Sequence, residues 1–306
     1  MNKTNVGLML DIVEHVRTVD NFTLSEVADL VKMAMDTYGI ILNRISDPRT
    51  SEWPFMMSPL PTILMVLAYL YVIIFLGPRL MENRKPFKLR EVLILYNGGQ
   101  VMLSLYMLYE HLMSGWFFDY SYVCQPVDYS NGDKAIRMAN LCWIYYISKL
   151  TEFADTIFFV MRKKDSQISF LHLYHHSLTP LETWILVKFV AGGHGTFSNL
   201  INNMVHVIMY FYYMVAAMGP RYQKYLWWKK HLTTIQLAQF FLVFIHSAQL
   251  LFVDCGYPRF LGALLLLHST IFFALFSHFY YKTYKANNAK LAQISNNNTT
   301  TKVKQQ

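Results

Sequence analysis

Long apolar segments separated by short polar ones dominate the chain between residues 58 and 285. A helix needs about 20 mostly apolar residues to cross the hydrocarbon core of a bilayer. Seven windows meet this length, at roughly residues 61 to 77, 92 to 112, 138 to 160, 170 to 190, 196 to 218, 232 to 253 and 260 to 281. The pattern predicts an all-α polytopic membrane protein with seven transmembrane helices, and six is the alternative count.

The composition supports this interpretation and indicates which classes of partner the protein binds. Of the 306 residues, 54% are hydrophobic and 15% are charged, which is typical of polytopic membrane proteins. The formal net charge is +8, but the basic residues fall in short runs between apolar segments instead of lining one polar surface. We therefore expect contact with membrane lipid and no binding of nucleic acid. Residues 1 to 50 contain acidic residues throughout and no continuous apolar stretch, so no cleavable signal peptide is expected.

Basic residues are distributed unequally among the loops between the predicted helices. Twelve lie in the first, third and fifth loops, namely Arg79, Arg84, Lys85, Lys88, Arg90, Arg162, Lys163, Lys164, Arg221, Lys224, Lys229 and Lys230. The loops between them contain Lys134, Arg137 and Arg259. Because cytosolic loops carry the excess of Lys and Arg, the odd-numbered loops and the C-terminus are predicted in the cytosol, and the N-terminus across the membrane.

The predicted topology divides the chain into three parts. Residues 1–57 form a lumenal N-terminal segment, residues 58–285 the helical membrane domain, and residues 286–306 a disordered cytosolic tail. The tail ends in Lys302-Val-Lys304-Gln-Gln, the pattern of a dilysine-type retrieval signal for the endoplasmic reticulum membrane. The alternative is an Asn/Thr-rich tail that ends in two lysines by chance.

The three cysteines fall in two different environments. Cys124 and Cys255 lie in the second and sixth loops, both on the lumenal side, where oxidising conditions allow a disulfide. Cys142 lies inside the third predicted helix and is expected to be a small buried hydrophobic residue, with a catalytic thiol as the alternative.

Four predicted helices carry polar side chains at helical spacing, which is costly in lipid and typical of functional sites. They are Lys149, Glu152, Asp155 and Thr156 on the third helix, His172, His175 and His176 on the fourth, Asn202, His206, Tyr210 and Tyr213 on the fifth, and Thr233, Gln236 and Gln239 on the sixth. The helix directions place all four groups in the cytosolic half of the membrane. Interhelical hydrogen bonds are the alternative for the single Gln, Thr and Tyr side chains, and a structural ion pair for Lys149 with Glu152.

Three clustered histidines favour chemistry over packing. One hypothesis is the iron site of a membrane desaturase or hydroxylase, but this needs further histidine boxes, and none occurs among the eleven histidines, so no metal is expected. The other hypothesis is a neutral imidazole that attacks a thioester and forms an acyl-imidazole, while neighbours move protons or stabilise an oxyanion. A seven-helix receptor or transporter is a third class.

The remaining histidines have simpler expected roles. His246, His268 and His278 each stand alone on an apolar helix and are expected to be structural, with satisfied ring nitrogens. His194 and His231 are expected in loops or at the membrane interface.

The four polar groups together resemble the signature motifs of the ELO family of very-long-chain fatty acid elongases. The matching segments are Lys149-x-x-Glu152-x-x-Asp155-Thr156, His172-x-x-His175-His176, Asn202-x-x-x-His206-x-x-Met209-Tyr210-x-Tyr212-Tyr213 and Thr233-x-x-Gln236-x-x-Gln239. The resemblance extends from about Asp47 to Tyr284. Gln167, five residues before His172, is similar to the branch that contains polyunsaturated and very-long-chain elongases.

The resemblance implies a 3-ketoacyl-CoA synthase without a cofactor. Such an enzyme joins a long-chain acyl-CoA to malonyl-CoA and releases CO2 and CoA, as the first step of elongation in the endoplasmic reticulum. The resemblance also implies that six of the seven helices enclose a tunnel for the acyl chain. Ketoacyl-CoA reductase, dehydratase and enoyl-CoA reductase would be functional partners, and a homo-oligomer is a further expectation.

Within this reaction the motif residues receive expected roles. His175 is the expected nucleophile, His206 would assist proton movement or position the malonyl unit, and His172 and His176 would orient the nucleophile. Asn202 and Gln236 would donate hydrogen bonds to a thioester or enolate oxygen. The wider supporting or substrate-binding set is Lys149, Glu152, Asp155, Asn202, Tyr210, Tyr213, Gln236 and Gln239. The candidates for binding the CoA phosphates are Arg162, Lys163, Lys164, Lys229 and Lys230.

Overall fold

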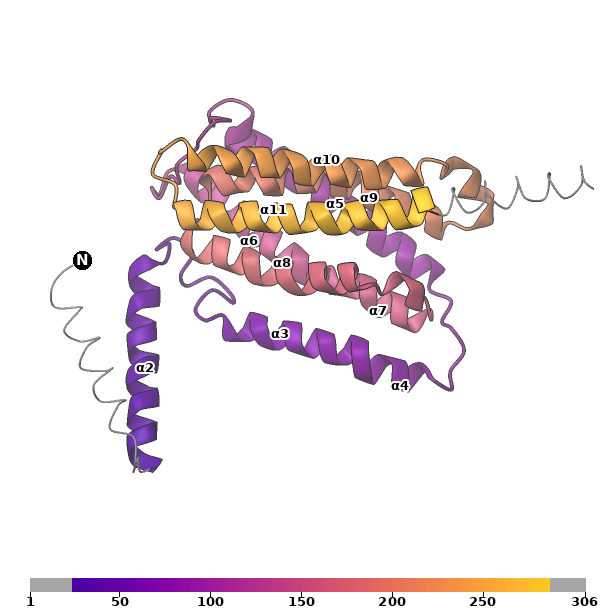
Figure 1. Cartoon of the computed structure of the whole chain (residues 1–306), viewed down its shortest axis with the longest axis horizontal. Coiled ribbons are helices and arrows are strands. Elements are labelled where there is room, and N and C mark those ends of the chain that lie inside the picture. Colours follow the sequence, from indigo (N-terminus) through magenta and orange to yellow (C-terminus); the bar gives the residue numbers. More distant parts are fainter. Residues whose placement is uncertain (1–23, 287–306) are drawn as a thin grey trace, which may run out of the picture. The chain divides into compact units, whose positions relative to one another are not determined.

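The structure is a computed structural model that describes residues 24–286, and within this range the chain forms helices and no strands (Figure 1). The chain divides into two compact units, residues 1–46 and 47–306. In the first unit the structure describes α2 (Leu24–Ile45), which carries many exposed apolar side chains. The predicted retrieval signal and most of the predicted C-terminal tail lie outside the described residues.

The second unit is a set of long helices joined by short turns. In chain order its helices are α3 (Leu60–Tyr71), the π-helical turn η1 (Val72–Leu76), α4 (Gly77–Met81), α5 (Arg90–His111), η2 (Leu112–Trp116), α6 (Asp133–Thr151), α7 (Phe153–Met161), η3 (Asp165–Gln167), α8 (Phe170–Phe189), η4 (Gly193–Gly195), α9 (Thr196–Ala217), η5 (Pro220–Tyr225), α10 (Lys229–Ala248), η6 (Gln249–Leu251), α11 (Arg259–Tyr280) and η7 (Tyr281–Ala286).

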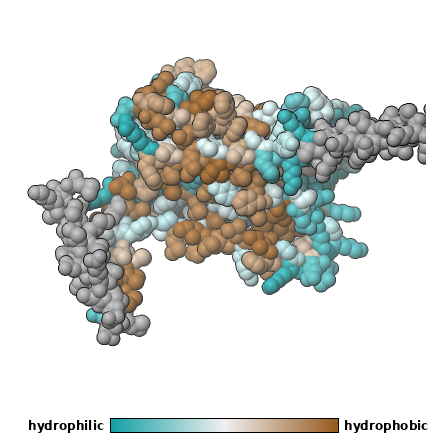
Figure 2. All heavy atoms as spheres, viewed as in Figure 1, coloured by the Kyte–Doolittle hydropathy of each residue, from teal (hydrophilic) through white to brown (hydrophobic). Residues whose placement is uncertain are grey.

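Five helical segments of the described chain are long and apolar enough to cross a membrane. They are Leu60–Met81, Arg90–Trp116, Gly193–Ala217, Lys229–Leu251 and Arg259–Lys285. The other two predicted windows are also helical, as α6 with α7 and as α8, but their charged and polar side chains keep them from meeting the same apolar criterion. Figure 2 shows hydrophobic surface across the middle of the helices and hydrophilic surface toward their ends, as expected for a multi-pass membrane protein.

The two more polar segments pack among the apolar ones. α5 lies along α9, α10 along α11, and α8 packs against both α6 and α3. The buried residues of α6 include Tyr145, Ser148 and Lys149. Polar groups of the third and fourth predicted windows therefore face other helices, where they can find partners that lipid does not offer.

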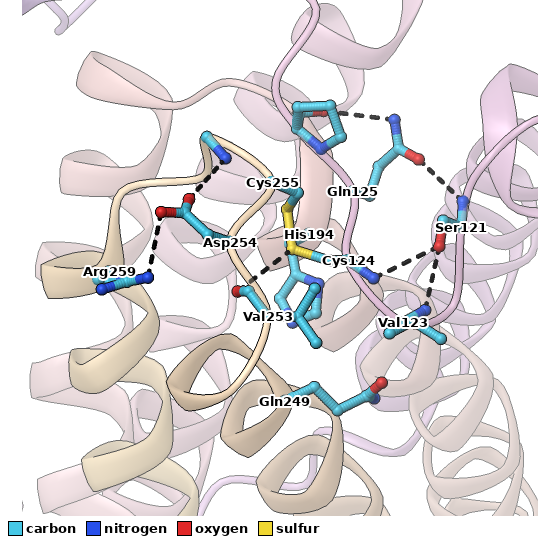
Figure 3. Close-up of a disulfide and its surroundings, with 12 residues drawn as sticks. Ser121, Val123, Cys124, Gln125, His194, Gln249, Val253, Asp254, Cys255 and Arg259 are labelled. Carbon is cyan, nitrogen blue, oxygen red and sulfur yellow. Dashed lines mark hydrogen bonds and ion pairs between the residues drawn. A yellow bond between two sulfur atoms is a disulfide. The ribbon is translucent and has the colours of Figure 1, made fainter.

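One end of this unit, which we call the disulfide end, is closed by covalent and polar links. Cys124 and Cys255 form a disulfide that joins residues 131 positions apart (Figure 3). The backbone N–H of His194 donates to the carbonyl of Gln125 at 2.8 Å. Gly193 has a φ of +65°, and a Cβ there would lie 2.9 Å from the Pro126 backbone, so this close approach requires glycine. The loop after α8 is thus held against the loop that contains Cys124.

The segment before α3 caps the C-terminal end of α8, which lies at the disulfide end. The backbone N–H of Asp47 donates to the Lys188 carbonyl and the Thr50 hydroxyl donates to the Val187 carbonyl, both at 2.8 Å. These are carbonyls of the last helical turn, which have no partner inside the helix. The indole N–H of Trp184 in turn donates to the carbonyl of Phe55 at 2.8 Å.

His194 lies in η4, the short turn between α8 and α9, as expected for a loop residue. Its burial was not expected: the ring is buried and stacks on that of His246, with centroids 3.8 Å apart. His246 was expected to be satisfied, yet its Nε2 has no hydrogen-bond partner in the described chain. The sequence could not show this because the two residues lie on different helical segments that meet only in the folded protein.

Candidate active site

The histidine motif lies at the beginning of α8. Ser169 caps this helix, since its hydroxyl accepts the backbone N–H of His172 at 3.2 Å. Pro180 lies inside the helix and has no N–H to donate to the carbonyl of His176, four residues earlier. The motif is therefore placed on the first turns of a helix that begins at a capped end and lacks one internal hydrogen bond directly after the histidines.

The three rings of the motif form a cluster in which each has different surroundings. The ring of His176 lies 4.2 Å from that of His172 and 5.1 Å from that of His175, between centroids. His172 Nε2 is 2.8 Å from the Thr156 hydroxyl, which also contacts the Tyr69 hydroxyl at 2.9 Å. His176 is buried and its Nδ1 has no hydrogen-bond partner among the described residues.

Lys149, Glu152, Asn202 and His206 form one connected polar network between α6 and α9. The Lys149 ammonium donates to Glu152 Oε1 at 2.7 Å and to Asn202 Oδ1 at 2.9 Å. The same Glu152 oxygen lies 3.4 Å from His206 Nδ1. Tyr145 donates a second hydrogen bond to Asn202 Oδ1, at 2.9 Å. Both charged side chains are only 2% exposed, so this pair is held by direct contacts and not by water.

Asp155 and Tyr210 form a second contact beside this network. The Tyr210 hydroxyl donates to Asp155 Oδ2 at 2.8 Å, and its ring packs 5.4 Å from that of His206. Tyr213 packs against Tyr210 but is 39% exposed. The structure therefore brings Asp155 and Tyr210 next to the His206 network and leaves Tyr213 at its edge.

The two glutamines of α10 have different environments. Gln236 directs its amide nitrogen toward the sulfur of Met209 at 3.6 Å. Gln239 is buried and lines a cavity that also contains His175. The sequence predicted that Asn202 and Gln236 contact the thioester and that Gln239 supports the site. In the structure Asn202 and Gln239 line the cavity with His175, and Gln236 is not part of this lining.

That cavity is narrow, with a volume of ≈ 60 Å³, and lies between α6, α8, α9, α10 and α11. Its lining consists of Tyr145, Lys149, His175, Thr179, Glu182, Thr183, Leu186, Ser198, Asn199, Asn202, Gln239, Phe240, Val243, Leu265 and His268. Of the four motif histidines, all within the described residues, only His175 is part of this lining. The cavity thus joins two imidazoles, one ammonium, one carboxylate and three side-chain amides to an apolar wall.

Two functional candidates escaped the sequence reasoning. Glu182 is the acidic residue of its apolar window, and His268 was expected to be structural. In the structure Nδ1 of His268 lies against Oε2 of Glu182, and both side chains line the cavity. The signal was present, because a lone carboxylate in a membrane helix needs a partner.

Basic residues gather at the opposite end from the disulfide, which we call the basic end. Lys163 donates to the carbonyl of Glu82 at 3.1 Å, and the Lys230 ammonium lies 5.7 Å from the Tyr280 ring. Lys164 and Lys229 are exposed, and Arg162 is half-buried. In Figures 1 and 2 the ends of α4 and α7 and the start of α10 form this hydrophilic end.

The iron-site hypothesis requires several histidine or carboxylate ligands around one metal ion. Residues 24–286 contain no group of three or more His, Cys, Asp or Glu side chains placed to hold one metal ion. One ring nitrogen of His172 is already within hydrogen-bond distance of Thr156.

Comparison with known proteins agrees with the motifs. A family model described as ELO, the GNS1/SUR4 family, matches residues 54–292. The chain is 51% identical over 264 residues to a very long chain fatty acid elongase of Aedes aegypti, which covers 86% of this chain and 74% of the relative. It is 51% identical over 267 residues to very long chain fatty acid elongase 7 of Drosophila melanogaster, covering 86% and 80%.

A mammalian relative shows the same similarity. Very long chain fatty acid elongase 7 of Rattus norvegicus is 53% identical over 242 residues, covering 78% of this chain and 86% of the relative. The region matched by the family model includes all four polar motifs and the helices that carry them. The chain belongs to the ELO family.

Proposed function

We propose that this protein is a 3-ketoacyl-CoA synthase that condenses a long-chain or very-long-chain acyl-CoA with malonyl-CoA, releasing CO2 and CoA. The observation that carries the proposal is the cavity in which His175 meets Lys149, Asn202 and Gln239. Its relatives are named very long chain fatty acid elongases. A neutral imidazole beside hydrogen-bond donors and an apolar wall is suited to accept an acyl group.

In the first half-reaction His175 is the nucleophile. A ring nitrogen attacks the thioester carbon, a C–N bond forms, the C–S bond breaks, and the CoA thiolate leaves with the proton of the imidazole. Gln239 and Asn202 line the same cavity and have amide N–H groups able to stabilise the developing oxyanion. The product of this step is an acyl-imidazole.

In the second half-reaction malonyl-CoA supplies the carbon nucleophile. Its carboxylate leaves as CO2, and the bonding electron pair becomes an enolate. The enolate carbon attacks the acyl carbon, a C–C bond forms, and the C–N bond to His175 breaks. One proton taken up from solvent restores the neutral imidazole, so charge and atoms balance over the cycle.

The network around His206 would assist these proton movements. Glu152 holds Nδ1 of His206 and also the Lys149 ammonium, which lines the cavity. In this arrangement fixed charges of the protein, and not water, would stabilise the charge that develops at the reacting atoms. His176 packs against the nucleophile and His172 packs against His176, so the two rings would fix the orientation of the nucleophile.

The membrane topology follows from the same proposal. α8 has 20 residues and is thus about 30 Å long, enough to cross, and α6 with α7 runs the other way between α5 and α8. We infer seven crossings, six of them around an acyl tunnel. The basic end would then face the cytosol, where Arg162, Lys163, Lys164, Lys229 and Lys230 can bind CoA phosphates. The disulfide end would face the lumen of the endoplasmic reticulum.

An experiment with labelled acyl-CoA in the absence of malonyl-CoA tests the intermediate. The purified protein is expected to release one equivalent of CoA and to retain the label, and adding malonyl-CoA should convert the label to 3-ketoacyl-CoA. His175→Ala should do neither, while Tyr109→Phe, at an exposed position of α5 outside the site, should behave like wild type. Stoichiometric release of CoA by His175→Ala would rule out this nucleophile.

The iron-dependent desaturase or hydroxylase remains the second candidate, because its histidine motif has the same form. It predicts stoichiometric iron in the purified protein and oxygen consumption with acyl-CoA. Acyl-CoA-dependent release of CO2 from malonyl-CoA by metal-free protein would exclude it. The reductases and dehydratase of the elongation cycle, and a homo-oligomer, remain proposed partners.

A further inference from the structure

The cavity lined by His175 also has polar side chains that the proposed reaction does not use. Glu182 follows His175 by seven residues on α8, which is two helical turns or roughly 10 Å. The side chains of Thr183, Ser198, Asn199 and His268 line the cavity together with Glu182. A plain hydrocarbon chain forms no hydrogen bond with any of these groups, so this lining is unusual for an acyl site.

The hydroxyl groups in this lining are already engaged with the backbone. Thr183 donates to the carbonyl of Thr179 at 2.8 Å, and Ser198 donates to the carbonyl of Gly195 at 2.7 Å. Such local bonds satisfy the donors within their own helices. The hydroxyl groups of these two residues are therefore not free to donate a hydrogen bond to a ligand.

Glu182 and His268 are different, because they meet across two helices. Nδ1 of His268 lies against Oε2 of Glu182, and the two side chains are 17% and 29% exposed. In the part of the chain that the structure describes, no hydrogen bond engages Oε1 of Glu182 or Nε2 of His268. One acceptor and one ring nitrogen thus remain available beside the cavity.

Phe272 fixes the position of this pair relative to the nucleophile. Its ring is fully buried, with its centroid 5.3 Å from that of His175 and 4.4 Å from that of His268. A rigid aromatic ring between the two imidazoles keeps them apart along the cavity. Whatever group binds at His268 is therefore held at a defined distance from the acyl carbon.

We propose that Glu182 and His268 form a subsite for a hydroxyl group in the middle of the acyl chain. The inference rests on the proposed function, since it assumes that the thioester carbon lies at His175. A hydroxyl group can donate to Oε1 of Glu182 and exchange a second hydrogen bond with Nε2 of His268. With carbon–carbon bonds of about 1.5 Å, an extended chain reaches the pair near roughly its eighth carbon.

The experiment compares octadecanoyl-CoA with two hydroxylated isomers, one with the hydroxyl in the middle of the chain and one with it beside the terminal methyl group. Kd is measured by calorimetry without malonyl-CoA in full-length protein carrying His175→Ala, which cannot form the acyl-imidazole. With malonyl-CoA, kcat/KM is measured in full-length protein that retains His175. Removing a hydrogen bond to a charged group lowers affinity roughly ten- to hundredfold. Glu182→Leu should reduce the preference for the mid-chain isomer by this factor while octadecanoyl-CoA still binds.

The controls separate this inference from a structural role and from the proposed function. Glu110→Gln breaks another interhelical ion pair, with Arg137, and should leave the preference unchanged. Glu182→Gln, which keeps the shape, serves if Glu182→Leu does not fold. The subsite is overturned if both Glu182 variants keep the ratio of Kd for octadecanoyl-CoA to Kd for the mid-chain isomer that is measured with Glu182 present. It is also overturned if the terminal isomer binds as tightly as the mid-chain isomer. Binding without turnover of any acyl-CoA by wild type would instead overturn the proposed function.

Discussion

Two clusters of buried polar groups lie in this protein, one around Arg49 at the disulfide end and one around Lys149 and Glu152 between α6 and α9. Arg49 donates to the Asp47 carboxylate and to the backbone carbonyls of Asp128, Ala135 and Ala191. Lys149 also donates to a carboxylate and to an amide oxygen, but it lines a cavity. Both clusters are satisfied, yet only one has groups within reach of a ligand.

The difference shows that buried polar groups can serve either to hold loops together or to support chemistry at a site. Around Arg49 every partner is fixed in the backbone or in an adjacent side chain, so the cluster ties loops together. Around Glu152 one oxygen is shared by Lys149 and His206, so the position of a proton on His206 alters the whole cluster. Substitutions at the first cluster should change stability alone, and substitutions at the second should change stability and activity together.

Glu152→Gln is expected to have the largest effect. Removing one partner of a buried ion pair costs about 3–5 kcal/mol of folding free energy, and losing the charge beside His206 should lower kcat by roughly a hundredfold or more. Thermal unfolding in detergent and condensation rates measure the two effects. The double variant Lys149→Met with Glu152→Gln should recover stability but not activity, and full activity of this variant would show that the network is only structural.

Arg49→Met should affect stability alone. It leaves the buried Asp47 carboxylate without its partner, at a cost of about 3–5 kcal/mol, and no atom of Arg49 lines the cavity. We expect a lower melting temperature and an unchanged kcat per folded molecule. Arg137→Met breaks the more exposed pair with Glu110 and should cost about 1 kcal/mol or less. A specific loss of kcat in Arg49→Met would contradict the distinction between the clusters.

Cys124→Ser should give a smaller loss at the same end. The disulfide to Cys255 joins two loops far apart in sequence, and its removal typically costs about 2–4 kcal/mol. The variant should melt at a lower temperature, and a reducing agent should lower the melting temperature of wild type but not of the variant. Cys142→Ala keeps the disulfide and should retain the response to reductant. Equal melting temperatures for wild type and Cys124→Ser would argue against a stabilising bond.

The two glutamines of α10 give the smallest and most discriminating test. Gln239→Leu removes an amide from the cavity and should lower kcat/KM by roughly tenfold. This factor corresponds to the loss of one hydrogen bond that contributes about 1.4 kcal/mol. Gln236→Leu removes only a contact to the Met209 sulfur, a weak acceptor, and should stay near wild type. The reverse order of effects would return the thioester contact to Gln236.

Much of this site could be predicted from local patterns. Helical spacing places His172, His175 and His176 on neighbouring positions, and it brings Lys149 and Glu152 into contact one turn apart. The apolar windows gave the positions of the helices, and five of them are long and apolar enough to cross a membrane. These features depend on residues close together in the chain, so they are visible without the fold.

Other features depend on how each helix is rotated against its neighbours. Gln236 and Gln239 are less than one turn apart, yet one meets Met209 and the other the cavity. His194 and His246 stack although neither is near the other in sequence. Such contacts are set by packing between helices, and no local spacing encodes the rotation of one helix about its axis.

The sequence by itself determined the helices, the membership of the polar motifs and the family, because these follow from the order and spacing of side chains along single helices. Only the tertiary structure decided that His175 is the motif histidine lining the cavity, that Glu152 joins Lys149 to His206, and that Glu182 meets His268. The reason is physical: lipid leaves polar side chains no partner outside the protein, and the choice among partners inside it depends on which helices lie side by side.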